Sequence, residues 1–216
     1  MNNFWNSKKI LVAVAHNDDV EFICGGLLSS FSNYPVNKKP EVGIITFGSR
    51  QENTGEKFNS VLKHQENSLE ILNINAWPIV NKQYRARFLP DFEDDIRMEL
   101  NAFKKIFKPD IVISHHVNDP NQDHVSVVEQ VKRVFSNKIV LGGEVPNTGF
   151  NLEPNLFVGL NKADILTKVR ALSCYLNEKD KDYFQEDVLL SLAIIRGAHS
   201  STYQYSEAFC LYRMPC

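Results

Sequence analysis

The sequence predicts an α/β protein with a mainly parallel sheet flanked by helices. Three observations indicate this fold: apolar runs rich in β-branched residues, intervening segments with helical spacing, and polar clusters where the runs end. Central strands of a parallel sheet form such runs because both of their faces are covered. Strands that alternate with helices build right-handed crossovers, which place successive strands side by side.

The first apolar run covers residues 10–15, and the polar residues 16–19 end it. An apolar segment with helical spacing follows from 22 to 31. Gly25 and Gly26 within it each cost about 1 kcal/mol of helix propensity, which predicts close approach of this helix to a neighbouring backbone.

The remaining elements are expected in the following order: strand 42–47, helix 58–72, a short strand 76–80, helix 94–107, strand 111–114, helix 123–135 and strand 138–141. Beyond residue 142 the pattern is less regular and predicts strand 156–160, helices 162–176 and 185–196, and a final strand 207–212.

The composition predicts one soluble domain over residues 1–216, because no repeat, low-complexity segment or linker interrupts the chain. A net charge of −2 gives no support to nucleic-acid binding. The four cysteines are scattered without a CxxC pair, which suits a reducing cytoplasm. The run at 10–15 is too short for a signal peptide or membrane insertion. We therefore expect a cytoplasmic protein; its oligomeric state, a homo-oligomer included, stays open.

Two polar clusters follow predicted strands at their carboxyl ends. Residues 16–19 (His-Asn-Asp-Asp) follow the first strand, and residues 119–124 (Asp-Pro-Asn-Gln-Asp-His) lie just past the fourth. Strands one and four are neighbours in the usual doubly wound order, and ligands bind outside the carboxyl ends of such strands. We therefore expect the two clusters to meet at one crevice.

These residue types are typical of a hydrolytic metal site. Two histidines and a carboxylate, here His16, Asp19 and His124, are a common zinc set that leaves positions open for water and substrate. The same set binds Fe(II) or another divalent metal. Asp18 is adjacent to a ligand and suits the role of general base, although it could instead be a helix N-cap.

Three segments resemble the PIG-L/LmbE-like N-acetylglucosaminyl deacetylases. Residues 15–19 with Cys24-Gly25-Gly26 are similar to the first signature of that family, and residues 109–124 to its second. Residues 196–197 and 205–209 resemble its C-terminal segment. The resemblance implies a Rossmann-like (LmbE-like) fold, a zinc ion on His16, Asp19 and His124, and Asp18 as base and then acid in acetamide hydrolysis.

The resemblance also assigns supporting roles. Asp123 corresponds to the carboxylate beside the ligand histidine. Asn121 stands where many members carry a histidine that assists the oxyanion, so His115, His199 or His64 could supply that donor. Arg50 follows the second strand, where family members often contact substrate.

The expected function is removal of an N-acetyl group from an acylated amino sugar or its conjugate. A deformylase or a sugar–thiol conjugate amidase would use the same site. Two other classes, a non-catalytic sugar- or metal-binding module and a nucleotide-binding α/β protein, remain as alternatives. The first would be expected to have lost a site residue, and the second lacks a phosphate-binding glycine loop.

Overall fold

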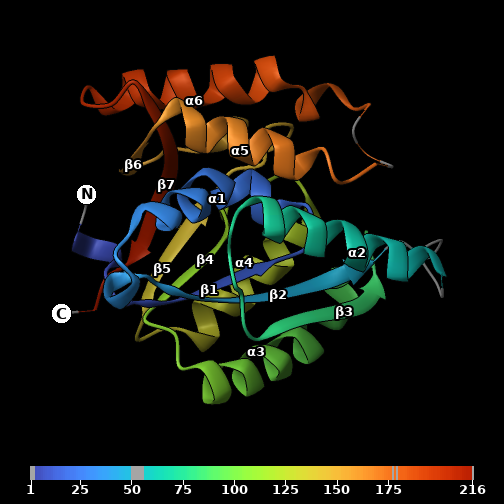
Figure 1. Ribbon diagram of the computed structural model, residues 1–216. Helices are drawn as coiled ribbons and strands as arrows, with labels where there is room; N and C mark the ends of the chain where they lie inside the picture. Colours follow the sequence, from blue (N-terminus) through green and yellow to red (C-terminus); the bar gives the residue numbers. More distant parts are fainter. Residues whose placement is uncertain (1–2, 50–55, 177, 179, 216) are drawn as a thin grey trace.

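A seven-stranded sheet organises the chain, with helices on both of its faces (Figure 1). The computed structural model describes residues 3–49, 56–176, 178 and 180–215. The strands are β1 Lys9–Val14, β2 Glu41–Ser49, β3 Ile79–Arg85, β4 Ile111–His115, β5 Ile139–Gly143, β6 Leu156–Leu160 and β7 Tyr205–Arg213. Their order is β3-β2-β1-β4-β5-β7-β6, with β7 antiparallel to both neighbours and the other pairings parallel. The predicted fold class is confirmed, and so is the pairing of strands one and four.

The helices form layers above and below this sheet. They are α1 Asp19–Ser30, α2 Glu56–Ile71, α3 Glu93–Phe107, α4 Gln122–Val134, α5 Lys162–Leu172 and α6 Glu186–Ser200. Helices α1, α2 and α5 lie on one face, α3 and α4 on the other, and α6 lies outside α5 (Figure 1). Within the described ranges, no helix is both long and apolar enough to cross a membrane.

The strand β1 divides the core into two parts. Ile10, Val12 and Val14 point into the cluster beneath α1 and α5, whereas Leu11 and Ala13 point into the cluster beneath α3 and α4. Successive side chains of a strand face opposite sides of the sheet, so a strand covered on both sides must be apolar throughout. This double burial explains the continuous apolar run.

The expected short strand at 76–80 is displaced in the structure. β3 begins at Ile79 and continues to Arg85, and its side chains are half-buried or exposed. It pairs only with β2 at the edge of the sheet. An edge strand tolerates polar side chains, so the second half of β3 has no apolar pattern by which it could be predicted. Two helix ends also differ, since α5 stops at Leu172 and α6 continues to Ser200.

Helix α1 is kinked at Cys24, whose φ of −146° and ψ of 19° are not helical. Beyond the kink, the Glu207 carboxylate accepts hydrogen bonds from the amides of Gly26 (2.9 Å) and Leu27 (2.8 Å). Before it, Lys168 Nζ donates to the Phe22 carbonyl at 2.6 Å. The two side chains thus bind the backbone groups that the kink frees.

The two glycines beside this kink leave room for side chains of neighbouring elements. A Cβ on Gly25 would lie 3.0 Å from the Lys168 side chain, and one on Gly26 would lie 2.7 Å from Leu160. The predicted close approach exists, but the expectation of a backbone neighbour is wrong, because the space is filled by side chains of α5, β6 and β7.

Candidate metal centre

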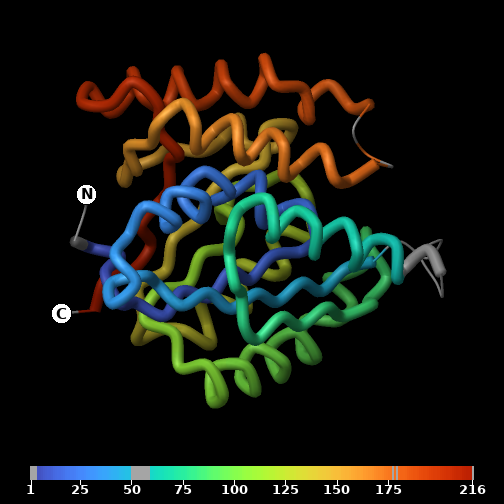
Figure 2. Tube along the Cα trace, viewed as in Figure 1, coloured from blue at the N-terminus to red at the C-terminus, as the bar shows by residue number. Residues whose placement is uncertain are grey.

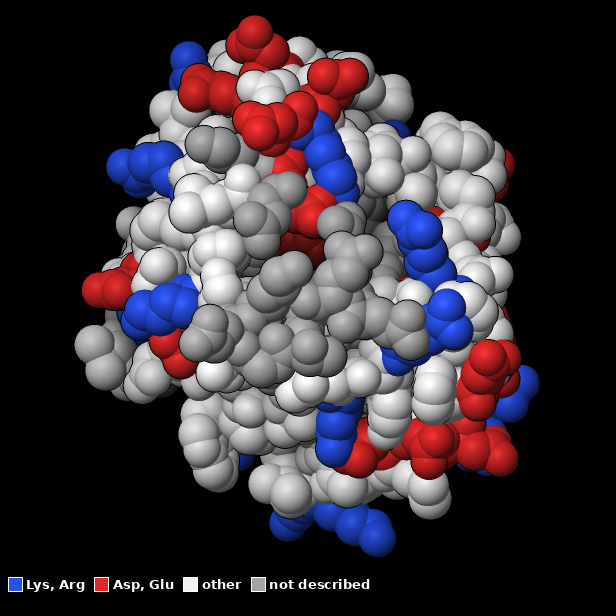
Figure 3. Space-filling view, turned by 90° about the vertical axis from the view of Figure 1, so that its right-hand side faces the viewer, with Lys and Arg blue, Asp and Glu red and all other residues white. Residues whose placement is uncertain are grey.

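The carboxyl ends of β1 and β4 carry the two predicted polar clusters to one place. His16 follows β1, His115 ends β4, and the Ala15 amide donates to His115 Nε2 at 2.8 Å. The carboxyl ends of these strands lie on one side of the molecule, and both chain ends lie on the opposite side (Figure 2). Seen from this edge, acidic side chains lie in a recess, with Lys and Arg side chains around it (Figure 3).

Three atoms from His16, Asp19 and His124 converge at this edge of the sheet. Asp19 Oδ2 lies 3.2 Å from His16 Nδ1 and 3.5 Å from His124 Nε2. The two imidazole rings are inclined at 57°, so their planes intersect and both lone pairs can point to one ion. These residues form one of two groups in the described part of the chain whose ligand atoms are close enough to hold a metal.

A second carboxylate lies behind each of these histidines. His16 Nε2 is 3.1 Å from Asp123 Oδ2, and His124 Nδ1 is 2.9 Å from Asp119 Oδ2. A carboxylate acceptor at one ring nitrogen places the proton there and leaves the other nitrogen free to bind metal. The donor set therefore fits a divalent zinc-type ion, with a carboxylate placed to hold each histidine in the metal-binding tautomer.

The backing carboxylates are themselves held firmly. Asp123 Oδ1 accepts from the Leu89 amide at 3.1 Å, and its Oδ2 accepts from the Arg87 amide at 2.5 Å. Asp119 accepts from Thr148 Oγ1 at 2.9 Å and from the Asn121 amide at 2.8 Å. Such bonds set the positions of the histidine rings before any ion binds.

The other group that could hold a metal combines His115, Asp119 and His124. The rings of His115 and His124 are stacked, with centroids 3.8 Å apart and planes only 11° from parallel. Imidazole binds a metal in the plane of its ring, and two stacked, nearly parallel planes do not meet at a nearby point. The geometry therefore disfavours this second set and leaves His16, Asp19 and His124 as the candidate ligands.

His115 packs behind the candidate ligands. It is fully buried, its Nε2 already accepts the Ala15 amide, and its Nδ1 has no partner among the described residues. Burial, together with the nearby His124, holds the pKa of His115 well below its ordinary value. This geometry favours a neutral ring that supports His124 over the direct catalytic role predicted from the sequence.

The electrostatics of the centre favour a bound cation. Burial by itself would lower the pKa of His16, but hydrogen bonds to Asp123 and Asp19 outweigh it and raise that pKa to about 10. Burial would raise the pKa of Asp19, yet the surrounding histidines, His124 first, hold it well below its usual range. Because a proton occupies the place that a metal would take, metal binding is expected to release it.

Asp18 lies at the N-cap position of α1, but its side chain makes no capping hydrogen bond. Burial and the neighbouring charge of Asp19 raise its pKa to about 6. The N-cap alternative therefore does not account for this carboxylate. A half-buried carboxylate with a pKa near neutrality, adjacent to a metal ligand, has the properties of a general base.

Hydrogen bonds hold the turn that carries these residues. Asn17 Nδ2 donates to Asn81 Oδ1 at 2.8 Å, and Tyr175 OH donates to the Asn17 carbonyl at 3.1 Å. Asn17 stands where the resembling family has proline. Here β3 and the segment after α5 supply by hydrogen bonding the rigidity that a proline ring would give.

Of the remaining predicted site residues, Asn121 lies in the centre and His199 does not. Asn121 lies in the centre: its Oδ1 caps α4 by accepting the Asp123 amide at 3.0 Å, and its Nδ2 is 3.2 Å from His124 Nε2. His199 does not join the centre, because α6 continues past the expected loop and leaves it exposed beside Arg196. Arg50 lies outside the described residues.

Two contributors to the centre were not assigned from the sequence. The sequence places Asp119 only within the polar cluster 119–124, and Thr148 lies in an irregular stretch after β5. The carboxylate five residues before His124 was a usable signal for a backing residue. Thr148 carried no local signal, because only the fold brings it to Asp119.

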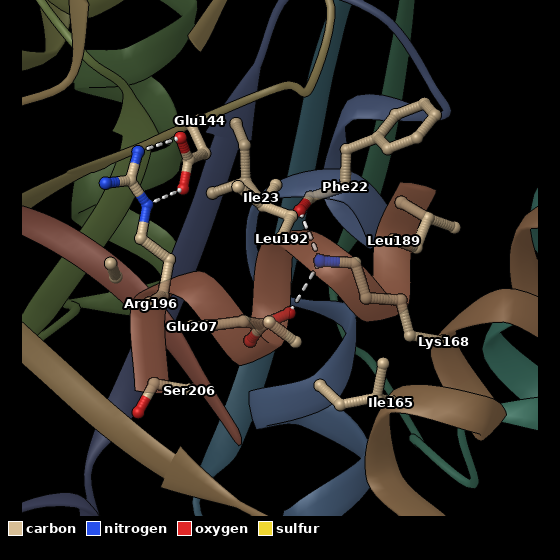
Figure 4. Close-up of a pocket in the computed structure, with 12 residues that line it drawn as sticks. Phe22, Ile23, Glu144, Ile165, Lys168, Leu189, Leu192, Arg196, Ser206 and Glu207 are labelled. Atoms are coloured by element: carbon tan, nitrogen blue, oxygen red, sulfur yellow. Dashed lines mark hydrogen bonds and ion pairs between the residues drawn. The ribbon is translucent and has the colours of Figure 1, made fainter. Parts of the chain in front are cut away.

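A separate cavity between α1, α5, α6 and β7 is not a substrate site (Figure 4). Its volume is about 20 Å³, which is room for about one water molecule. Figure 4 shows Lys168 bound to Glu207 and Arg196 bound to Glu144 at its walls. An amino sugar needs a far larger and more open space.

Comparison with solved structures shows the same fold in proteins of low sequence identity. N,N'-diacetylchitobiose deacetylase from Pyrococcus horikoshii is 20% identical, with a TM-score of 0.78 over 100% of this chain and 86% of that one. The zinc-inhibited form of teicoplanin deacetylase is 14% identical, with a TM-score of 0.74 over 93% and 97%. The 4-carboxy-2-hydroxymuconate hydratase from Pseudomonas putida is 14% identical, with a TM-score of 0.73 over 97% and 98%. Since deacetylases and a hydratase share it, the fold does not select a reaction.

Sequence comparison is more specific. No curated protein matches the chain, but residues 11–135 match the PIG-L family, which is described as GlcNAc-PI de-N-acetylase. The matched region covers more than half of the 216 residues and contains both polar clusters and every residue of the candidate metal centre except Thr148. The chain therefore belongs to the PIG-L family.

Proposed function

We propose that this protein is a zinc-dependent hydrolase that removes the acetyl group from an N-acetylated amino sugar or its conjugate. Membership of the PIG-L family supports a hydrolase of the sugar N-deacetylase kind. The single observation that carries the proposal is the convergence of His16, Asp19 and His124 on one point, with the Asp18 carboxylate, which makes no capping hydrogen bond, beside them. Fe(II) or another divalent ion could occupy the same donors.

His16, Asp19 and His124 would hold the ion. When bound, such an ion polarises the acyl carbonyl and lowers the pKa of a water molecule. Asp119 and Asp123 keep the two histidines in the metal-binding tautomer throughout the reaction. The protein thus presents a preorganised site, which is the main source of rate enhancement in hydrolysis of this type.

Asp18 moves the proton. Its carboxylate takes a proton from the attacking water and gives it to the amine nitrogen as the amide bond breaks. A pKa of about 6 allows both steps near neutral pH, because neither the charged nor the neutral form is strongly disfavoured. The products are acetate and a free amino sugar.

Asn121 would bind the oxygen of the acyl group. Its Oδ1 is committed to the cap of α4, so its Nδ2 donor faces His124 Nε2, beside the place where the ion would bind. An amide donor at this place can stabilise the developing oxyanion. His115 is a poorer donor, because it is buried behind the ligands with its Nε2 engaged.

A substrate panel tests the proposal. The zinc-loaded protein is incubated with N-acetylglucosamine, N,N'-diacetylchitobiose and N-formylglucosamine, and released acetate, formate and free amine are measured. We expect acetate and amine in equal amounts, and no product after chelation. Formate alone would indicate a deformylase, and no product from a fully metal-loaded protein would overturn the hydrolase assignment.

A further inference from the structure

An open groove borders the metal centre. It has a volume of roughly 520 Å³ and is lined by Arg85, Arg87, Phe88, Pro90, Asp91 and Gln122. The first five of these residues come from the end of β3 and the segment after it, and Gln122 begins α4. A volume of this size is typical of small-molecule sites. Two arginines and one aspartate give the lining a positive balance beside an otherwise acidic recess.

The groove and the metal centre share one atom. Asp123 Oδ2, which receives the hydrogen bond from His16 Nε2, also accepts the backbone amide of Arg87. In addition, the Gln122 side chain donates to the Arg87 carbonyl. The Arg87 backbone is therefore fixed to the start of α4, immediately beside the ligands.

This attachment places Arg87 in an uncommon conformation. Its φ is +71°, in the left-handed region that a residue with a long side chain rarely adopts. Such strain persists where the surrounding bonds hold it, and it is concentrated at functional sites. The guanidinium is exposed, and no carboxylate within the described ranges forms an ion pair with it.

The Arg85 side chain is also held in place, by the Phe88 ring. Its guanidinium lies 3.6 Å from the centre of the Phe88 ring, so its flat face is occupied. Stacking leaves the in-plane N–H groups free, and it reduces the side-chain freedom that binding would otherwise remove. Arg196, by contrast, is bound at two atoms to Glu144 and has little capacity left for a ligand.

We propose that Arg85 and Arg87 bind an anionic group, a phosphate or a carboxylate, carried by the amino-sugar substrate. This assignment rests on the proposed deacetylase function and specifies its substrate class. A guanidinium offers parallel N–H donors that match two oxygens of either anion. With the acyl group at the metal centre and the charged substituent on the two arginines, the sugar lies in the groove between them.

The test separates binding from catalysis. Binding of glucosamine 1-phosphate, a carboxymethyl glucosaminide and neutral methyl glucosaminide to the zinc-loaded protein is measured by calorimetry. We expect at least one anionic sugar to bind roughly tenfold or more tighter than the neutral one, and Arg85→Gln and Arg87→Gln each to remove most of that preference. The tighter of the two anions identifies the group.

Arg133→Gln is the matched control, because Arg133 is an exposed arginine in the last turn of α4, at the end opposite to Gln122. It should keep the wild-type preference. A preference that survives in both groove variants would mean that the anion binds the metal ion, and equal binding of charged and neutral sugars would mean that no anion site exists; either result overturns the proposal.

Deacetylation of N-acetylglucosamine 1-phosphate and its neutral methyl glycoside is measured with the same variants. Arginine-dependent anion binding without acetate release would refute the proposed reaction and leave the anion site standing. Acetate release at equal kcat/KM from both substrates, unchanged by either substitution, would refute the anion site and leave the reaction standing.

Discussion

Two clusters of charged residues border helix α1, one along its middle and one at its N-terminal end, and they differ in how their charges are balanced. In the closed cluster, which comprises Lys168, Glu207, Glu144 and Arg196, charged groups are paired with each other or with backbone atoms. In the metal centre, Asp119 and Asp123 each bind one nitrogen of a histidine, while the facing nitrogens point toward Asp19.

This difference shows how burial of charge should be interpreted in this fold. A paired and hydrogen-bonded cluster is neutral as a whole and needs nothing further. The second cluster has four carboxylates, those of Asp18, Asp19, Asp119 and Asp123, around His16 and His124, so it carries excess negative charge that a bound cation would offset. The first arrangement holds α1 in its kinked form; the second, at the N-terminal end of the same helix, presents ligands.

The largest effect within the metal centre is expected from Asp18→Asn. The amide has nearly the same shape but cannot take a proton, so kcat should fall by roughly 10²- to 10⁴-fold. Because Asp18 is not among the converging ligands, metal content should be unchanged. Acetate release and elemental analysis on the same sample check both points; undiminished activity would contradict the assigned base.

Lys168→Met breaks the closed cluster. It leaves Glu207 buried without its cation and the Phe22 carbonyl without its donor, so we expect a loss of about 3–5 kcal/mol in the free energy of unfolding. Urea denaturation measures it. Lys63→Met is the control, because Lys63 pairs with Glu66 at the surface and should lose at most about 1 kcal/mol. Equal losses in both variants would contradict the comparison.

Asp119→Asn weakens the support of a ligand without removing the ligand. The amide no longer fixes the proton on His124 Nδ1, so metal affinity should fall by roughly 10- to 100-fold. Competition with a chelator of known affinity measures the change. An affinity equal to the wild-type value would show that Asp119 does not act through His124.

The remaining prediction concerns Glu21, buried beneath the turn and bound by Ser68 Oγ (2.5 Å) and Tyr175 OH (3.1 Å). Burial raises its pKa to about 8, against the lowering effect of Ser68. Because this folded-state pKa exceeds the ordinary value of 4.5, the folded protein holds an extra proton between these values. The stability contribution of Glu21 is therefore lost as pH rises from about 4.5 to about 8.

Glu21→Gln tests this directly in the metal-free protein. The glutamine imitates the protonated acid and does not titrate, so the variant should lose less stability between pH 5 and pH 8 than the wild type. Urea denaturation at the two pH values gives both slopes. Identical slopes would show that Glu21 is ionised in the folded protein across this range.

The comparison also explains what the sequence could and could not predict. The strands β1 and β4 were recognisable because burial on both faces requires unbroken apolar runs, and the polar residues after them therefore stood out. Adjacent parallel strands then implied that His16 and His124 meet, which the structure shows. The local sequence pattern and the strand order were sufficient to predict that His16 and His124 lie close together.

Contacts between distant elements were not predictable in this way. The pairing of Thr148 with Asp119 depends on a loop after β5, and the attachment of Arg87 to Asp123 depends on the end of an edge strand. The exposed position of His199 follows from the length of α6, whose final turn the sequence did not indicate. In each case the side chain carries no periodic signal, because its position is set by packing rather than by neighbours in sequence.

The most direct test of the central claim is the metal content of the purified protein and of three variants, after reconstitution with zinc. We predict about one ion per chain in the wild type and in Lys168→Met, and loss of that ion in His124→Ala and Asp19→Asn. A full complement of zinc in His124→Ala, or none in the wild type, would contradict the assignment of His16, Asp19 and His124 as metal ligands.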